Sequence, residues 1–390
     1  MRKLNILISG AGVAGPMLAL WLHRRGFAAT VVERAPALRE GGQAVDFRGN
    51  QMDILRRSGL LEDVRRHQTP TGPQRVVDDE GATRATLPPE FFSGEVEILR
   101  GDLSRLMYER TKDHTDYRFG DWITSLREVG DGVEVGFAHA APAKFDLVVG
   151  ADGMHSGVRH LAFGPESRFR TDSGYHIAGF SAPNHLGVTS DGLIYNAPGR
   201  GVMVAPKPGG AEISVGFYFA AEGLDYDRHD AEQQKKIVHD RFRGLGWQVP
   251  TLLEGLDKAD DLYFDSLCQM RLEHYSHGRV VLLGDAAWGA GPGGGGTGLA
   301  MMAAYVLAGE LAAAGGDHRI AFARYEQEVR AAAEAGLKQA KGAGPFLAPA
   351  TEAKIRSRNR AYRFLGRQPL LGLFRRMALK AANTLSLKDY

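Results

Sequence analysis

The hydrophobic pattern of the chain begins with a predicted strand, a turn and a helix. Residues 4–9 form a short apolar run that ends at a glycine turn, and the stretch 16–26 after it has helical character and ends at another glycine. Two more mostly apolar runs, at 145–149 and 280–283, also stop at a glycine. Short apolar runs bounded by glycine are typical of buried strands. The pattern therefore predicts an α/β domain.

The pattern changes between about residues 166 and 267. Strand-like runs at 174–182, 191–199, 201–209 and 211–221 are separated by glycine and proline turns, which predicts an antiparallel sheet and a second, substrate-binding domain. Residues 75–89 are expected to add an early strand to this sheet. The side chains expected to line a cavity are Phe180, Tyr195, Met203, Phe217 and Phe219. For any one of them, a place in the ordinary core of the sheet is the stronger interpretation.

The last part of the chain is rich in alanine and basic residues. Residues 318–341 predict a surface helix, and a basic, amphipathic tail follows. Such a tail can bind a membrane, but its apolar residues are expected to dock onto the protein body instead. These residues are Tyr362, Phe364, Leu365, Leu370, Leu373 and Phe374.

Composition narrows the class of protein. The 390 residues suggest two domains, and 50 glycines exceed the roughly 27 expected at about 7%. A net charge of +2 gives no reason to expect nucleic-acid or membrane binding. The single cysteine, Cys268, excludes an internal disulfide, is expected in the core, and fits a reducing cytoplasm. The apolar N-terminal stretch is broken by glycines and Pro16, so it predicts no export signal, and no metal-ligand cluster stands out.

The first turn carries a dinucleotide-binding pattern. Its sequence GAGVAG places Gly10, Gly12 and Gly15 between a strand and a helix, where they allow a tight turn, close approach of a pyrophosphate and close helix packing. Glu33 ends the next strand and can accept hydrogen bonds from an adenosine ribose. Ala14 in the turn and Arg34 beside Glu33 complete this candidate set, which suits both NAD and FAD.

Two further glycine–acid turns favour FAD over NAD. Asp152 and Gly153 follow the strand at 145–149, and Asp285 follows the strand at 280–283. A long cofactor that crosses several strand ends explains such repeated turns. A predicted helix begins within the glycine run after Asp285, and its N-terminus can stabilise negative charge on a reduced flavin. The candidate residues there are Gly295, Gly296, Thr297 and Gly298.

These three stretches together resemble the class A FAD-dependent monooxygenases, the family with the para-hydroxybenzoate hydroxylase fold. The short branch of tetracycline-oxygenating and polyketide-tailoring enzymes is the most similar. The resemblance implies a Rossmann-like FAD domain, an antiparallel-sheet substrate domain and a C-terminal helix that braces them. It also implies that Arg100 and Asp46 line the cofactor. Arg48, Gly49 and Pro292 become flavin-adjacent candidates, and no catalytic side chain is assigned.

The positions of the cofactor motifs, near residues 10, 152 and 285, predict a discontinuous domain arrangement. The FAD domain is expected to comprise residues 1–72, 96–165 and 268–345, and the substrate domain residues 73–95 and 166–267. The C-terminal helix is expected within 346–390.

The chain also departs from this family pattern. Trp288 stands where many relatives have histidine, and Ala300 and Tyr305 stand where many have asparagine and an acid. The run Gly293–Gly296 is looser than the usual motif, which leaves open how tightly a flavin is held.

The resemblance implies a reaction in which NADH or NADPH reduces FAD and O2 then forms a flavin C4a-hydroperoxide. This species hydroxylates an aromatic or polyketide-like small molecule. The alternative is an NAD(P)H-dependent flavin reductase that supplies a partner oxygenase, and a third hypothesis is a flavin-binding protein without turnover. The sequence identifies neither the substrate nor the nicotinamide donor.

Overall fold

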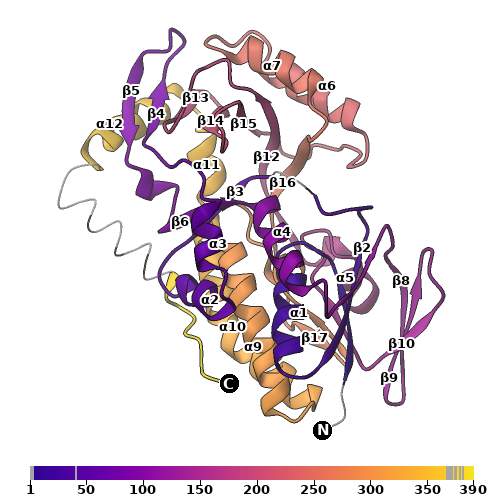
Figure 1. Cartoon of the computed structure of the whole chain (residues 1–390). Helices are drawn as coiled ribbons and strands as arrows, with labels where there is room; N and C mark the ends of the chain where they lie inside the picture. The colour runs from indigo at the N-terminus through magenta and orange to yellow at the C-terminus, as the bar shows by residue number, and fades with distance from the viewer. Residues whose placement is uncertain (1–3, 40–41, 366–371, 373–375, 377–378, 380–381) are drawn as a thin grey trace.

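Figure 1 shows the computed structural model of the chain, in which residues 4–39, 42–365, 372, 376, 379 and 382–390 are described. One half of the molecule is built on a six-stranded sheet with the order β17-β18-β11-β1-β2-β7. The strands are parallel except β17, as expected for a Rossmann-like domain. They are Asn5–Ser9 (β1), Ala28–Glu33 (β2), Asp116–Phe119 (β7), Leu147–Gly150 (β11), Ser276–His277 (β17) and Val280–Leu282 (β18).

Helix α9 is the central helix of this half. It packs against α1, α2 and α10 and is buried over most of its length. By length and composition α9 could cross a membrane, but its burial is that of the core helix of a globular protein. The helices here are Ala14–Arg24 (α1), Gln51–Ser58 (α2), Leu61–Arg66 (α3), Arg100–Thr111 (α4), Gly157–Phe163 (α5), Asp285–Trp288 (α8), Gly296–Ala313 (α9) and His318–Ala340 (α10).

The other half is built on a seven-stranded sheet with the order β16-β12-β15-β14-β13-β4-β5. The pairs are antiparallel except β13 with β4, and the four predicted strands and the early strand all belong to this sheet, which we call the substrate sheet. Its strands are Gln74–Val77 (β4), Thr83–Leu87 (β5), Arg170–Pro183 (β12), Gly192–Ala197 (β13), Arg200–Pro206 (β14), Glu212–Ala220 (β15) and Tyr263–Met270 (β16).

Helices α6 (Ala231–Phe242) and α7 (Val249–Lys258) cover one face of the substrate sheet (Figure 1). Tyr195, Phe217 and Phe219 pack in the core on this covered face. The prediction that these three side chains line a cavity is therefore wrong. Phe180 and Met203 do border the cavity described below.

Cys268, the single cysteine, lies on β16 and is buried in the core as expected, and burial raises the pKa of its thiol to about 11.

Two small sheets and several short helices complete the fold. The remaining elements are β3 (Ala44–Phe47), β6 (Val96–Leu99), β8 (Ile123–Val129), β9 (Gly132–Phe137), β10 (Ala143–Phe145), the 3-10 helices Pro89–Phe91 and Glu166–Arg168, α11 (Ala343–Leu347) and α12 (Glu352–Leu365).

A C-terminal helix is present. α12 packs against β5 and β13, and Tyr362 docks as predicted into a hydrophobic cluster with Leu87 and Ile194 of these strands. Residues 386–390 have no regular secondary structure. Residues 382–390 instead lie against the half built on the six-stranded sheet, so the C-terminal region touches both halves. The side chains of Phe364 and Leu365, and the residues Leu370, Leu373 and Phe374, lie outside the described part of the chain.

Candidate active site

The three predicted glycine–acid motifs lie together at one edge of the parallel sheet. They follow β1, β11 and β18, whose carboxyl ends meet there because the strands are parallel and adjacent. A cavity of about 2320 Å³ opens at this edge and extends to the face of the substrate sheet opposite α6 and α7, part of which α11 and α12 cover. This position, at the strand ends of an open α/β sheet, is where such folds bind ligands.

Most of the predicted residues border this cavity. Three predicted residues are not among its lining: Gly15, Gly49 and Gly298. The predicted residues that line it are Gly10, Gly12, Ala14, Glu33, Arg34, Asp46, Arg48, Arg100, Asp152, Gly153, Asp285, Pro292, Gly295, Gly296 and Thr297.

The glycines of the first turn have separate physical roles. Gly10 has φ +107°, and a Cβ there would fall 2.5 Å from the Ala151 carbonyl oxygen. A Cβ on Gly15 would fall 2.0 Å from the Gly10 carbonyl oxygen, so this glycine lets helix α1 pack on strand β1. A Cβ on Gly12 would meet only the Arg100 guanidinium, at 3.6 Å. Gly12 therefore keeps open a space that faces the cavity.

Two helices begin at the cavity without a side-chain cap. No side-chain hydrogen bond caps α1 at Val13 or α9 at Gly295. The first backbone N–H groups of a helix need partners, and together with the helix dipole they attract anions. The uncapped ends of α1 and α9 therefore offer donors to a bound phosphate or to an anionic ring.

Three charged residues that line the cavity, Glu33, Asp285 and Arg100, have hydrogen-bonding atoms available to a ligand. Backbone N–H groups of Ala11 and Ala35 donate to the Glu33 carboxylate at 2.8 and 2.9 Å, which holds it in place with lone pairs to spare. Burial raises the pKa of Asp285, and the positive charge of Arg100 opposes that rise. Among the described residues, neither Asp285 nor the Arg100 guanidinium has a hydrogen bond to another side chain.

Other predicted residues are already paired within the protein. Arg48 Nε donates to Asp46 Oδ2 at 2.8 Å, and both side chains are half-buried at the cavity. The Asp152 carboxylate accepts from the Ser156 hydroxyl and from the Val158 backbone N–H. Asp152 therefore holds the start of α5. Burial raises its pKa, and these hydrogen bonds oppose the rise.

The glycines outside the cavity lining make close packing contacts. A Cβ on Gly298 would fall 2.4 Å from Gln51 Cδ, and one on Gly49 would fall 2.2 Å from Asn383 Oδ1. Trp288, which replaces the histidine of many relatives, is buried between Tyr275 and Tyr325 and does not line the cavity.

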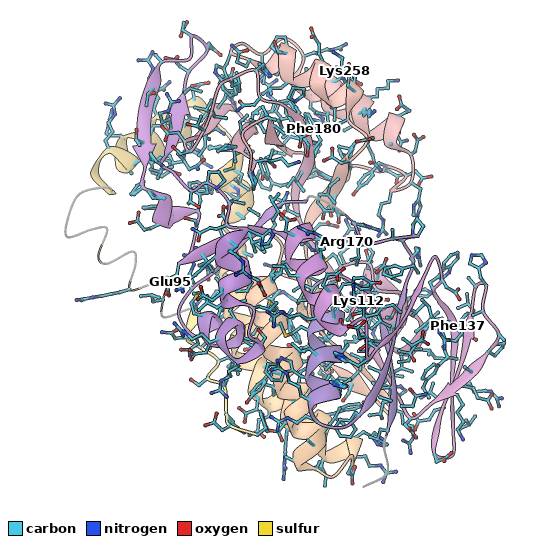
Figure 2. All side chains as sticks on the ribbon, viewed as in Figure 1. Glu95, Lys112, Phe137, Arg170, Phe180 and Lys258 are labelled. Carbon is cyan, nitrogen blue, oxygen red and sulfur yellow. The ribbon has the colours of Figure 1, made fainter. Side chains whose placement is uncertain are left out.

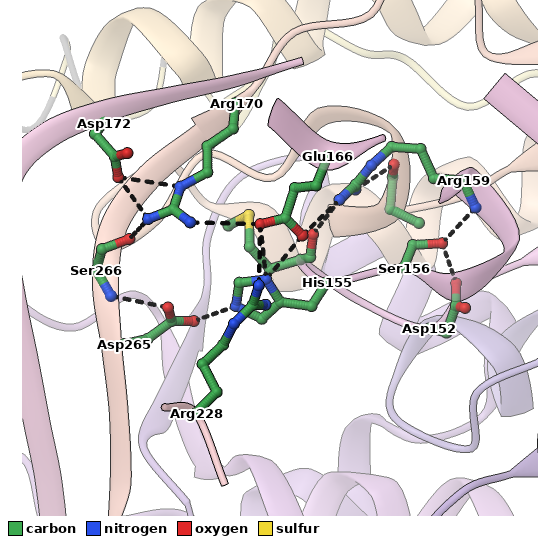
Figure 3. A network of polar contacts seen from close by, with 12 residues as sticks. Asp152, His155, Ser156, Arg159, Glu166, Arg170, Asp172, Arg228, Asp265 and Ser266 are labelled. Carbon is green, nitrogen blue, oxygen red and sulfur yellow. Dashed lines mark hydrogen bonds and ion pairs between the residues drawn. The ribbon is translucent and has the colours of Figure 1, made fainter. Parts of the chain in front are cut away.

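Sequence reasoning missed an ionic network at the junction of the two halves. His155 lies between two carboxylates, with Nδ1 2.9 Å from Glu166 Oε2 and Nε2 2.9 Å from Asp265 Oδ2 (Figure 3). Burial alone would lower the pKa of His155, but these hydrogen bonds outweigh it and raise the pKa. Both ring nitrogens face carboxylate oxygens, so both hydrogen bonds form only when the imidazole is protonated, and His155 links the loop after β11 to β16 of the substrate sheet.

Three arginines complete this network around Glu166. Arg159 Nη2 lies 3.2 Å from the Glu166 carboxylate, Arg170 3.5 Å and Arg228 3.7 Å. Figure 2 places Arg170 at the level where the two halves meet. The sequence feature that could have indicated this network is Asp265, a charged residue within the strand Tyr263–Met270.

The face of the substrate sheet opposite α6 and α7 forms the far wall of the cavity. Gly179 and Gly216 pair across β12 and β15, and both line the cavity. A Cβ on Gly216 would fall 2.9 Å from the Tyr218 ring, so the glycine lets this ring lie back over the sheet. Glycines inside a strand often mark close approach of a ligand. Burial raises the pKa of Tyr218 to about 12, which keeps its phenol neutral.

The arrangement fits an adenine dinucleotide of the length of FAD. The open cradle at Gly12, the two uncapped helix ends and the held carboxylate of Glu33 are the donors and acceptors that a diphosphate and a ribose require. Asp285 and Arg100 add an acceptor and a cation to the lining of the same cavity, with the Arg100 guanidinium facing Gly12.

Comparison with known proteins agrees with this geometry. A family model described as an FAD binding domain matches residues 3–340. An uncharacterised protein of Mycobacterium tuberculosis (strain ATCC 25618 / H37Rv) is 40% identical over 331 residues, which is 83% of this chain and 89% of that protein. A flavin-dependent monooxygenase of Legionella longbeachae serogroup 1 (strain NSW150) is 34% identical over 342 residues, with 86% and 88% covered.

A solved structure is similar over the full length. The crystal structure of the tetracycline destructase Tet(51) superposes with a TM-score of 0.85 at 30% identity, and the match covers 100% of both chains. The agreement extends over both halves of the molecule, the substrate sheet included.

Proposed function

The chain belongs to the FAD-binding class A flavin-dependent monooxygenases, and we propose that it uses NAD(P)H and O2 to hydroxylate an aromatic or polyketide-like small molecule. One observation carries this proposal. A single cavity of about 2320 Å³ connects the FAD motifs with the face of the substrate sheet opposite α6 and α7. A cofactor and an organic substrate can therefore meet inside the protein.

The residues that would hold FAD follow from the contacts above. The N-terminus of α1 and Gly12 would take the diphosphate, and Glu33 would take the ribose hydroxyls. The Arg100 guanidinium, which faces Gly12, would add a cation beside the diphosphate, and Asp285 would bind a polar group of the cofactor. When bound, FAD supplies the redox chemistry that accepts a hydride from NAD(P)H and activates O2.

The protein's own contribution is orientation and the exclusion of water. The N-terminus of α9 borders the cavity and would stabilise negative charge there. Met203, Phe346 and Phe92 line the substrate side with apolar surface, and the neutral Tyr218 phenol offers a hydrogen-bond donor. Such a wall suits a flat, largely apolar molecule with a few polar groups.

The reaction can be tested directly. The purified protein is first examined for a flavin spectrum that bleaches when NADH or NADPH is added without oxygen. Aerobic assays then follow NAD(P)H oxidation with tetracycline and with a panel of hydroxylated aromatic compounds. The proposal requires that at least one compound stimulates oxidation and yields a product heavier by one oxygen atom, measured by mass spectrometry.

The same assays separate the competing hypotheses. Oxidation that depends on added free flavin and never yields an oxygenated product would support the flavin reductase, which hands reduced flavin to a partner oxygenase. A protein that binds flavin but oxidises no NAD(P)H would be a binding protein only. A cytoplasmic location remains part of the proposal, since NAD(P)H is supplied there.

A further inference from the structure

The segment Asn383–Tyr390, which we call the tail segment, is docked on the half of the molecule that is built on the six-stranded sheet. Tyr390 fits against Gly309 of α9, where a Cβ would fall 2.3 Å from the Tyr390 ring. Its hydroxyl donates to Glu310 at 2.9 Å, and its main-chain oxygen accepts from Arg25 at 2.7 Å. The far end of the tail segment is thus held by both packing and hydrogen bonds.

Tyr305 fixes the middle of the tail segment. Its hydroxyl donates to the main-chain oxygen of Lys388 at 2.8 Å and accepts from Arg57 at 2.9 Å. Arg57 also donates to Asp389 at 2.6 Å. Tyr305 is one of the residues at which this chain departs from the family pattern, and here it serves the tail segment.

The near end of the tail segment holds the turn at Gly49 and Asn50. The Asn50 backbone N–H donates to Asn383 Oδ1 at 2.9 Å, and the Asn50 side chain donates to the Leu385 main-chain oxygen at 3.0 Å. Asparagine at the N-cap position normally accepts from its own helix, but Asn50 makes no such bond to α2. Its side chain is used to bind the tail segment instead.

This turn is continuous with the wall of the cofactor cavity. Arg48 and Gln51 flank it and line the cavity, and the Arg48 backbone N–H donates to Gln51 Oε1 at 3.3 Å. Gln51 in turn packs against Gly295 and Gly298 at the start of α9. Leu385 of the tail segment also borders the cavity and is 4% exposed.

We propose that Asn383 is a positioning residue for the cofactor site. Through its hydrogen bond to Asn50 it holds the turn that sets the places of Arg48 and Gln51, and through Gln51 the glycine-rich start of α9. The inference rests on the proposed use of this cavity for FAD. It assigns a role in the site to a residue 333 positions from its partner in the sequence.

Two variants of Asn383 test the proposal. Asn383→Ala removes the acceptor, whereas Asn383→Asp keeps an oxygen at the same place. Because Asn383 is exposed, both variants are expected to fold, and urea unfolding checks this. The Ser386→Ala variant is the control, since the Ser386 hydroxyl makes only a marginal 3.4 Å contact with Asn50.

Two readouts follow the variants. In the FAD-free protein, the rate of trypsin cleavage at the Arg48–Gly49 bond, identified by mass spectrometry, reports opening of the turn. Asn383→Ala should raise this rate and weaken FAD binding, measured by fluorescence titration, each by about fivefold to tenfold for one lost hydrogen bond. Asn383→Asp and Ser386→Ala should match the wild-type protein.

The outcomes are decisive in either direction. Wild-type values for Asn383→Ala in both readouts would overturn the proposal, and so would an equal loss in Asn383→Asp, because the acceptor would then not matter. If the wild-type protein binds no FAD, the proposed function fails, and the cleavage rates still decide whether Asn383 holds the turn.

Discussion

Gly15 lies so close to Gly10 that a Cβ on Gly15 would fall 2.0 Å from the Gly10 carbonyl oxygen. The contact sets the distance between helix α1 and strand β1. It therefore also sets where the first N–H groups of α1 face the cofactor cavity, so packing and phosphate binding depend on the same glycine.

The first prediction contrasts two glycines of this turn. Gly15→Ala should lower the free energy of unfolding of the FAD-free protein by about 1–3 kcal/mol, because the added methyl overlaps a backbone oxygen. Gly12→Ala should leave that free energy within about 0.5 kcal/mol, since its Cβ has space, yet weaken FAD binding by occupying the cradle. Urea unfolding and FAD titration measure the two effects. Equal stability of the two variants would contradict the packing role of Gly15.

The second prediction concerns Arg100. Its guanidinium faces Gly12 and makes no hydrogen bond to the described side chains, so Arg100→Ala should leave the FAD-free protein as stable as the wild type. FAD binding should weaken by about tenfold or more, since a hydrogen bond to a charged group contributes about 1.5–3 kcal/mol. Arg105→Ala is the matched control, because Arg105 lies on the same helix and pairs with Asp102 on the surface. Unchanged FAD affinity in Arg100→Ala would exclude a cofactor role.

How far the sequence predicts this site depends on the range of the contacts. Gly10, Asp152 and Asp285 were found because each directly follows an apolar strand, and parallel strands bring such ends together. Sequence could not show that Asn383 meets Asn50, because only tertiary packing joins them.

The sequence also could not show which face of the substrate sheet borders the cavity. Side chains alternate along β15, so one face carries Phe217 and Phe219 and the other carries Tyr218. Which face borders the cavity depends on where α6 and α7 pack, and large aromatic side chains suit a helix-covered core as well as a ligand.

The third prediction is a pH dependence caused by His155. Because the pKa of His155 is raised in the folded protein, its stabilising contribution is complete below its unfolded pKa of about 6.5. The contribution is lost as the pH rises through the folded value. The free energy of unfolding of the wild-type protein should therefore exceed that of His155→Gln by about 1–3 kcal/mol at pH 6. This difference should decrease at alkaline pH.

Its control is the exposed His160→Gln, for which this difference should stay near zero. The pKa values of Glu166 and Asp265 are lowered, because hydrogen bonds from His155 outweigh their burial, so part of the stability is also lost as the pH falls through their folded values. Urea unfolding between pH 4 and pH 9 measures both the alkaline and the acidic loss of stability. If the stability difference between the wild-type protein and His155→Gln grew with pH, His155 would not be charged in the folded protein. The groups around it that also affect this difference are Arg159, Arg170 and Arg228, which surround Glu166.

The fourth prediction separates two neighbouring residues of β15. Phe217 is fully buried against Phe242, with ring centroids 4.6 Å apart, so Phe217→Ala should cost about 3–5 kcal/mol of stability. Tyr218 borders the cavity, so Tyr218→Phe should leave stability almost unchanged. It should instead raise KM for any compound that stimulates NAD(P)H oxidation, because the neutral phenol can no longer donate to it. Urea unfolding and steady-state kinetics test the pair. Unchanged kinetics in Tyr218→Phe would mean that substrate contacts this wall only through its apolar surface.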